Sequence, residues 1–141
     1  MTVIENSVQL GRSPEDVFDY LVDMRNELQW NPDVESMEMI SAGPIGVGTK
    51  FLAKWKQTQL VEVECTKFER PFTWSYVSGG PLSASFRATV TSHGVGSVLT
   101  VYMDVRAYGK LRLFFPVLLP MLKRSEKQNM SRIKQAVEGK A

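Results

Sequence analysis

The stretch that decides the fold is residues 110–122, KLRLFFPVLLPML, which runs directly into residues 123–140, KRSEKQNMSRIKQAVEGK. The first segment is almost wholly apolar, whereas the second is polar and basic with an apolar stripe at helical spacing. We therefore expect a long C-terminal helix whose apolar part is enclosed by something concave while the rest faces water. The alternating strands that precede it are the material for such an enclosure.

The size and composition predict one globular domain. The chain has 141 residues, so we expect a single domain over residues 1–141. The net charge of +2 is too small to indicate nucleic-acid binding. Its distribution is uneven: residues 1–106 hold 9 Lys and Arg against 13 Asp and Glu, and residues 107–141 hold 8 against 2. A basic, apolar helix favours an anionic surface, but basic residues near a helix C-terminus also simply complement its dipole.

Neither the start of the chain nor its apolar run predicts a targeting or membrane-spanning segment. Residues 1–10 lack the basic and apolar regions of a signal peptide. The run at 111–122 is shorter than the ~20 residues that cross a bilayer, and two prolines interrupt it. A single cysteine, Cys65, excludes an intramolecular disulfide framework and suits a reducing compartment. We therefore expect a cytoplasmic protein.

The pattern along the chain predicts the order strand, two short helices, six strands and a long helix. Residues 2–10 form the first expected strand, and Ser13-Pro14-Glu15-Asp16 is a strong helix start. A second short helix is expected to begin at Asp23 and to end near Trp30, because Pro32 disfavours its continuation. Further alternating strands are expected at 34–41, 49–56, 60–69, 72–78, 82–92 and 97–108. Their shared apolar face needs a cover, and only the C-terminal helix is long enough.

Five short motifs, in order and suitably spaced, resemble the START/Bet v 1-like (SRPBCC) superfamily in its bacterial polyketide cyclase/dehydrase-type branch. They are Ser13 to Leu21 with Asp23, Trp30-Asn31-Pro32, Gly46-Val47-Gly48-Thr49, Glu69-Arg70-Pro71, and the closing helix around Arg132, Lys134 and Glu138. The resemblance implies an α+β helix-grip fold: a curved antiparallel seven-stranded sheet wrapped around a long C-terminal helix, with two short helices after the first strand. It also implies an internal cavity for a hydrophobic small molecule; some members of the superfamily cyclise aromatic polyketides.

The residues that could support catalysis are few, so we expect no catalytic residue, no cofactor and no metal ion. His93 is the only histidine and lies in a predicted turn, which removes histidine general-base chemistry and a multi-histidine metal site. Cys65 shares the apolar side of its strand with Val61 and Val63. It is expected to be a small buried hydrophobe rather than a reactive thiolate.

Aromatic residues spread over several elements are the positive evidence for a binding cavity. Core packing is the default for such residues, and lining a ligand site is the alternative. The candidate ligand-binding residues are Trp30, Phe51, Trp55, Trp74, Tyr76, Phe86, Met103, Phe115, Leu118, Leu122, Ser125 and Asn129. Tyr76 and Asn129 are the expected orienting groups, because a buried hydroxyl or amide needs a hydrogen-bond partner. A structural or exposed role for Asn129 is the alternative.

Pro116 and Pro120 each remove an intrahelical hydrogen bond and favour a kink. The apolar segment is therefore either a separate bent lid over the mouth of the cavity or simply the entry to the helix.

The sequence favours non-catalytic binding, and carriage, of a hydrophobic small molecule such as a lipid, isoprenoid or polyketide. Two alternatives stay open. One is a polyketide cyclase/dehydratase-type enzyme, which would need an acid or base pointing inward. The other is a protein that docks on a membrane or a partner through residues 111–122, the less favoured interpretation. Nothing in the sequence indicates an oligomeric state.

Overall fold

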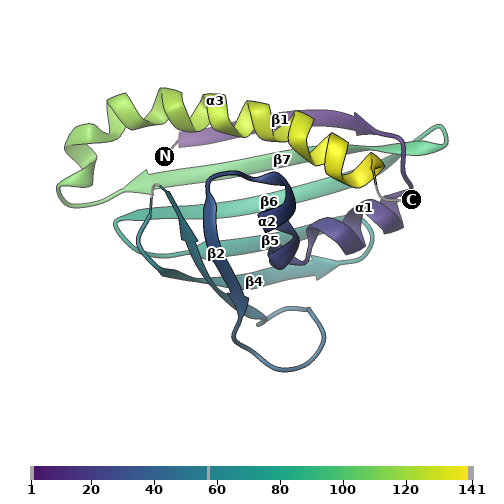
Figure 1. The fold of residues 1–141 in the computed structure, drawn as a ribbon, viewed down its shortest axis with the longest axis horizontal. Coiled ribbons are helices and arrows are strands. Elements are labelled where there is room, and N and C mark those ends of the chain that lie inside the picture. Colours follow the sequence, from purple (N-terminus) through teal and green to yellow (C-terminus); the bar gives the residue numbers. More distant parts are fainter. Residues whose placement is uncertain (1, 57, 140–141) are drawn as a thin grey trace.

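In the computed structural model, which describes residues 2–56 and 58–139, one antiparallel sheet curls beneath a long helix (Figure 1). Seven strands lie in the order β1-β7-β6-β5-β4-β3-β2. Their bounds are β1 (Thr2–Leu10), β2 (Val34–Met39), β3 (Lys50–Trp55), β4 (Val61–Glu69), β5 (Thr73–Ser78), β6 (Leu82–His93) and β7 (Gly96–Ala107). The helices are α1 (Pro14–Leu21), the 3-10 helix η1 (Met24–Asn26), α2 (Glu27–Trp30) and α3 (Leu111–Glu138). The predicted helix-grip fold is confirmed.

The short helices begin where the sequence predicts. Ser13 caps α1 by accepting a hydrogen bond from the backbone N–H of Asp16, with Pro14 in the first turn. This satisfies one of the free donors at a helix start. Asp23 accepts from the backbone N–H of Arg25 at the start of η1. These caps turn the chain back over the sheet directly after β1.

The core lies between the inner face of the sheet and the helices. Phe18 of α1 packs edge-on against Phe68 and Trp74, with ring centroids 5.1 Å apart in both pairs. The pairing register shifts between Cys65 and Lys67, and such irregularities bend a strand and increase its twist. The bend helps the sheet to curl around the interior.

The helix α3 is continuous from Leu111 to Glu138 and contains both prolines. Of the two alternatives for the apolar segment, a separate bent lid and the entry to the helix, the structure therefore fits the helix entry. Pro116 and Pro120 are both exposed and four residues apart, so they share one side of the helix. The carbonyls that lose their helical partners are on that solvent side, where water can satisfy them. The predicted helical segment extends to Lys140, which lies outside the described residues.

Two residues considered for chemistry occupy structural positions. Cys65 is fully buried, and burial raises the pKa of its thiol, so it packs as a small hydrophobe as predicted. His93 is exposed at the end of β6, next to the hairpin to β7. Neither residue faces the interior as a reactive group.

Candidate ligand-binding cavity

A cavity of about 150 Å³ lies between the inner face of the sheet and α3, and it is partly open to solvent. Strands β3 to β7 form its floor, α2 closes one side, and α3 covers it. Most of the lining is aliphatic or aromatic, as in small-molecule sites generally. The predicted internal cavity is therefore present in this fold.

Nine of the twelve predicted residues line this cavity. They come from α2, from four strands and from α3, and are Trp30, Trp55, Trp74, Tyr76, Phe86, Met103, Leu122, Ser125 and Asn129. Alternation along the strands and three- and four-residue spacing on the helix place them there. Whether they contact a ligand stays a prediction.

Phe51, Phe115 and Leu118 lie outside the lining. Phe51 is fully buried, and its ring packs edge-on against that of Tyr76, with the ring centroids 5.9 Å apart, but only Tyr76 lines the cavity. Phe115 and Leu118 join a second cluster with Ile4 and Val105 of the sheet. Their side chains fix the first half of α3 on the sheet instead of facing the cavity.

The hydroxyl of Tyr76 already has a partner within the protein. It donates a hydrogen bond of 2.6 Å to the backbone carbonyl of Val22. Burial raises the pKa of Tyr76 strongly, so this phenol stays protonated. The ring of Tyr76 lines the cavity, but its hydroxyl proton is already donated to the segment after α1. The hydroxyl therefore has no proton left to donate to a ligand.

Asn129 retains a free donor. The residue is only 1% exposed, and its side-chain oxygen accepts from a guanidinium nitrogen of Arg132 at 2.9 Å. Among the described residues, the amide nitrogen Nδ2 has no hydrogen-bond partner. Trp74 is similar: it is 1% exposed, and its indole N–H is buried without an acceptor in the described chain. Both residues line the cavity, and such donors normally find a partner.

Three acidic residues that the sequence analysis missed also line the cavity: Glu27, Asp33 and Glu126. Glu126 had a usable signal, because it is four residues after Leu122 and three before Asn129, both on the predicted inward stripe. Glu27 had none, because a four-residue helix has no readable periodicity.

The environment of Glu27 and Glu126 disfavours the charged form of both carboxyls. One oxygen of Glu27, Oε2, accepts from the Trp55 indole and from the Asn31 amide, both at 2.7 Å. Burial raises the pKa of Glu27, and these hydrogen bonds oppose the rise. Burial, with the charges of Glu27 and Asp33, raises the pKa of Glu126 to about 7. One side of the cavity thus carries three carboxyl groups, while most of the remaining lining is apolar.

A sheet wrapped around a C-terminal helix, with a cavity between them, matches a known family. Residues 1–138 match the family described as polyketide cyclase/dehydrase and lipid transport. The chain belongs to this family. The resemblance carried by the five sequence motifs is confirmed. No curated protein sequence matches the chain.

Solved structures with the same fold are distant in sequence. The Bacillus halodurans protein BH1534 is 15% identical, with a TM-score of 0.76 and 98% of each chain covered. Ara h 8.0201 is 20% identical, with a TM-score of 0.70, over 96% of this chain and 97% of that one. The di-domain ARO/CYC BexL from the BE-7585A biosynthetic pathway is 14% identical, with a TM-score of 0.72. The match covers 99% of this chain and 51% of BexL. At these identities the likeness concerns the fold alone.

Proposed function

We propose that this family member binds a hydrophobic small molecule, such as a lipid, isoprenoid or polyketide, in the cavity beneath α3. The observation that carries the proposal is the cavity itself, apolar over most of its lining and containing donors on Trp74 and Asn129 that have no partner in the described part of the chain. Burying apolar ligand surface there would supply ~25 cal/mol per Å². A space of this volume takes a group about the size of benzene, and a longer ligand would extend through the open side.

The experiment is ligand capture with a blocked variant. Ala84 of β6 lines the cavity, and Ser85 is its exposed neighbour on the same strand. We expect Ala84→Phe to fill the cavity and Ser85→Phe to leave it open. Native mass spectrometry of protein purified from its natural host should show an added apolar mass with the wild type and Ser85→Phe, but not with Ala84→Phe. Equal capture by all three proteins would place the ligand elsewhere and contradict the proposal.

Incubation of the captured molecule with fresh protein addresses the enzymatic alternative. The inward acids Glu27, Asp33 and Glu126 are acid/base groups of the kind that a cyclase or dehydratase would need. A binding protein releases the captured molecule unchanged. A released product that differs from the molecule supplied in mass or in chromatographic retention would instead favour the enzyme, since ring closure alone leaves the mass unchanged.

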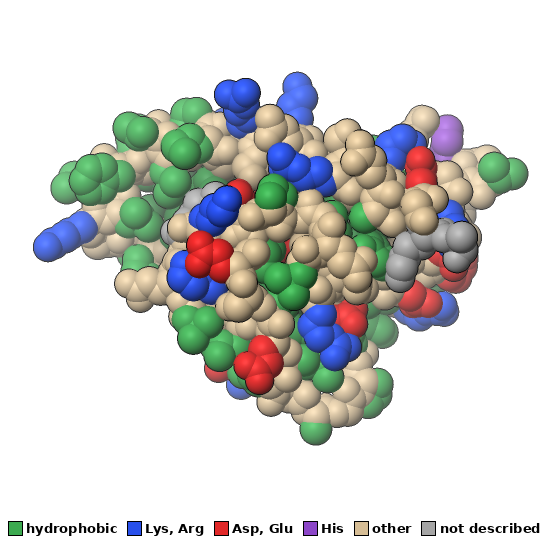
Figure 2. Space-filling view, viewed as in Figure 1, with side chains coloured by type: hydrophobic (Ala, Val, Ile, Leu, Met, Phe, Trp, Pro, Cys, Tyr) green, Lys and Arg blue, Asp and Glu red, His purple; other side chains and the backbone are tan. Residues whose placement is uncertain are grey.

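A second candidate function is docking on an anionic membrane surface, and one specific observation favours it. The outer face of α3, meaning Leu113, Phe114, Val117 and Met121, is 79%, 62%, 71% and 62% exposed, respectively. Figure 2 shows hydrophobic side chains gathered over the start of α3. Contiguous exposed apolar side chains mark interaction surfaces more often than single ones do.

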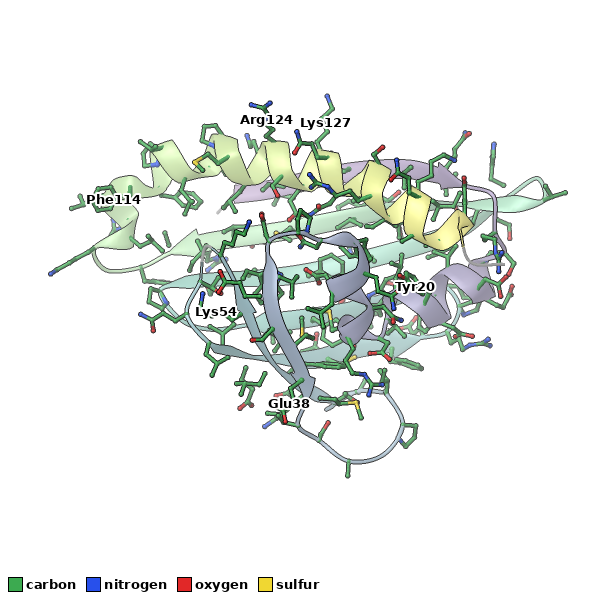
Figure 3. The ribbon with its side chains drawn as sticks, in the orientation of Figure 1. Tyr20, Glu38, Lys54, Phe114, Arg124 and Lys127 are labelled. Carbon is green, nitrogen blue, oxygen red and sulfur yellow. The ribbon has the colours of Figure 1, made fainter. Side chains whose placement is uncertain are left out.

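The charges around this outer face select the partner. Lys110, Arg112, Lys123, Arg124 and Lys127 are all exposed along α3 or just before it. In Figure 3, Arg124 and Lys127 point away from the sheet on the same helix as Phe114. Glu126 is the only acidic residue between Tyr108 and Val137, and it lines the cavity. Apolar side chains surrounded by basic ones fit an anionic bilayer, where the apolar groups enter the headgroup boundary.

No helix among the described residues is long and apolar enough to cross a membrane, so this docking would be superficial. We expect co-sedimentation with phosphatidylglycerol vesicles and little with phosphatidylcholine vesicles. The double variant Phe114→Ser, Val117→Ser should lose it, whereas Val95→Ser should keep it, because Val95 is fully exposed on the β6–β7 hairpin. Sedimentation velocity tests whether a second copy of the chain covers this face instead. A wild type that is a dimer and a double variant that is a monomer would assign the face to a second copy and overturn the docking.

A further inference from the structure

The acidic side of the cavity is built from three separate elements. Glu27 lies on α2, Asp33 lies just before β2, and Glu126 lies on α3. Asp33 accepts a hydrogen bond of 3.1 Å from the hydroxyl of Ser125, next to Glu126. The carboxyl groups of Glu27 and Asp33 are close enough to Glu126 to perturb its ionisation. The helix and the segment around α2 thus bring three carboxyls to one region.

Two of these carboxyls, those of Glu27 and Glu126, lack a full set of partners among the described residues. Glu27 uses only its Oε2 oxygen, so Oε1 has no hydrogen bond among the described residues. Glu126 makes no hydrogen bond or ion pair within the described part of the chain, although its carboxyl lines the cavity in a poorly solvated position. A poorly solvated carboxyl without a partner is costly to the fold, which makes it a candidate for binding a ligand.

The cations on the surrounding elements do not compensate. Arg25 of η1 pairs with Asp23 at 2.8 Å, and Lys54 of β3 pairs with Glu35 at 2.9 Å. Arg132 of α3 donates to Asn129. Lys123, Arg124 and Lys127 of α3 and Lys56 after β3 are exposed, while β5, β6 and β7 contribute no charged side chain to the lining. None of the described lining residues is Lys, Arg or His.

The arrangement suits an organic cation better than a metal ion. Among the described residues, no group of three or more His, Cys, Asp or Glu side chains is placed to hold a metal. The neighbouring lining is apolar and includes the rings of Trp30, Trp55 and Phe86. Aromatic faces also attract ammonium groups. Both features point to a ligand that carries a positive charge on a hydrophobic body.

We propose that the cavity takes an apolar amine, with its ammonium group among Glu126, Glu27 and Asp33 and its hydrophobic part against the aromatic lining. The proposal rests on the proposed small-molecule binding and narrows its ligand class. An ammonium group donates three hydrogen bonds and neutralises mutual repulsion between the carboxylates. A fatty acid or other carboxylate would add a further negative charge in a poorly solvated space, so it is disfavoured.

A matched set of four probes tests this chemistry: toluene, benzyl alcohol, benzylamine and benzoate. All four carry one benzene ring, the group that a cavity of this volume accommodates. Binding to the full-length protein is measured at pH 8 by chemical-shift titration. We expect benzylamine to bind at least about tenfold tighter than toluene or benzyl alcohol, and benzoate to bind weakest. At pH 5 the preference for the amine should shrink, because Glu126 is then protonated while benzylamine keeps its charge.

The variant Glu126→Gln keeps the shape of the side chain and removes its charge. We expect it to bind benzylamine about tenfold more weakly while toluene affinity is unchanged. Glu38→Gln is the matched control, since Glu38 is exposed and lies at the end of β2 away from α3 (Figure 3). Glu27→Gln gives a second reading should Glu126→Gln misfold, because Gln can still accept from Trp55.

The outcomes separate this inference from the function beneath it. If toluene and benzyl alcohol bind as tightly as benzylamine, or if Glu126→Gln and Glu27→Gln leave the amine preference intact, the amine proposal is wrong and hydrophobic binding stands. Preference for benzoate would also overturn it. If none of the four probes binds and no apolar mass is captured from the host, the proposed binding function fails and this inference fails with it.

Discussion

The two halves of α3 differ in the chemical character of the side chains that they expose to solvent and of those that they bury. In residues 111–122 apolar side chains face both the sheet and the exterior, so Phe115 is packed while Phe114 is exposed. In residues 123–138 the outward side is polar and the inward side carries Asn129, Glu126 and the core residue Ile133. The first half therefore exposes apolar side chains that do not pack against the sheet. The second half places polar side chains in the cavity that lack a full set of hydrogen-bond partners among the described residues. The exposed apolar surface is the basis of the proposed membrane docking, and the buried polar groups are the basis of the proposed amine binding.

The largest expected effect compares one apolar residue from each half. Ile133→Ala removes a side chain that is 4% exposed in the main core, and should destabilise the protein by about 2–5 kcal/mol. Leu113→Ala removes a mostly exposed side chain and should change stability by less than about 0.5 kcal/mol. Urea denaturation midpoints measure both. A comparable loss for Leu113→Ala would show that the outer face of α3 is covered in solution.

The next effect concerns the buried polarity of the second half. Glu126 has an ordinary pKa of 4.5, raised to about 7 in the folded protein. Between these values the folded chain holds more protons than the unfolded chain, so wild-type stability should fall as pH rises through this window. Glu126→Gln should therefore be more stable than wild type by about 1–3 kcal/mol at pH 8, and close to it at pH 4. Thermal melts across this range with Glu38→Gln as control check it. A stability difference between Glu126→Gln and wild type that does not vary with pH would contradict the raised pKa of Glu126 as its cause.

A smaller effect is expected from the basic residues that follow the outer face of α3. Arg124→Ser and Lys127→Ser should each weaken binding to phosphatidylglycerol vesicles by about 1 kcal/mol, close to fivefold, because each removes one attraction to the anionic surface. High salt should remove most of the difference between variant and wild type. Co-sedimentation at two salt concentrations measures this. Salt-independent losses would point to a specific protein contact instead of a lipid surface.

The fold was predictable from the sequence because its signals are local and repeated. Alternation in the strands, the Ser13 cap and the closing helix each follow from neighbouring residues, and the five motifs agreed with them. The same reasoning placed Trp55, Trp74 and Phe86 correctly in the cavity lining. Alternation along a strand shows which side chains share the inner face of the sheet, and the cavity is lined by side chains of that face.

The rest of the site was not predictable because it depends on how side chains from different helices and strands pack against one another. Phe51 is on the inward face of its strand, but it packs against the ring of Tyr76 and does not line the cavity. The hydroxyl of Tyr76 finds a backbone carbonyl that only the folded turn after α1 supplies. Glu126 lies on the inward stripe, but a general expectation that charges face water outweighed its spacing. Long-range packing decides the positions of Phe51 and the Tyr76 hydroxyl and is absent from the local pattern, whereas the spacing of Glu126 on the helix did carry a local signal.

The smallest expected effect lies at the end of α3. Glu138 accepts hydrogen bonds from Lys134 at 2.6 Å and from the backbone N–H of Gly11 at 2.8 Å, which joins the helix end to the turn after β1. These bonds lower the pKa of Glu138 below its ordinary 4.5, so its stabilisation is present above that value and is lost as pH falls through the lowered pKa. Glu138→Gln should therefore lower the melting temperature slightly at pH 7 and not at pH 3. Hydrogen exchange should locate the change at the end of α3 and near Gly11. Faster exchange in residues 111–122 instead would mean that the two halves of α3 are not independent, because loosening one end would then release the other.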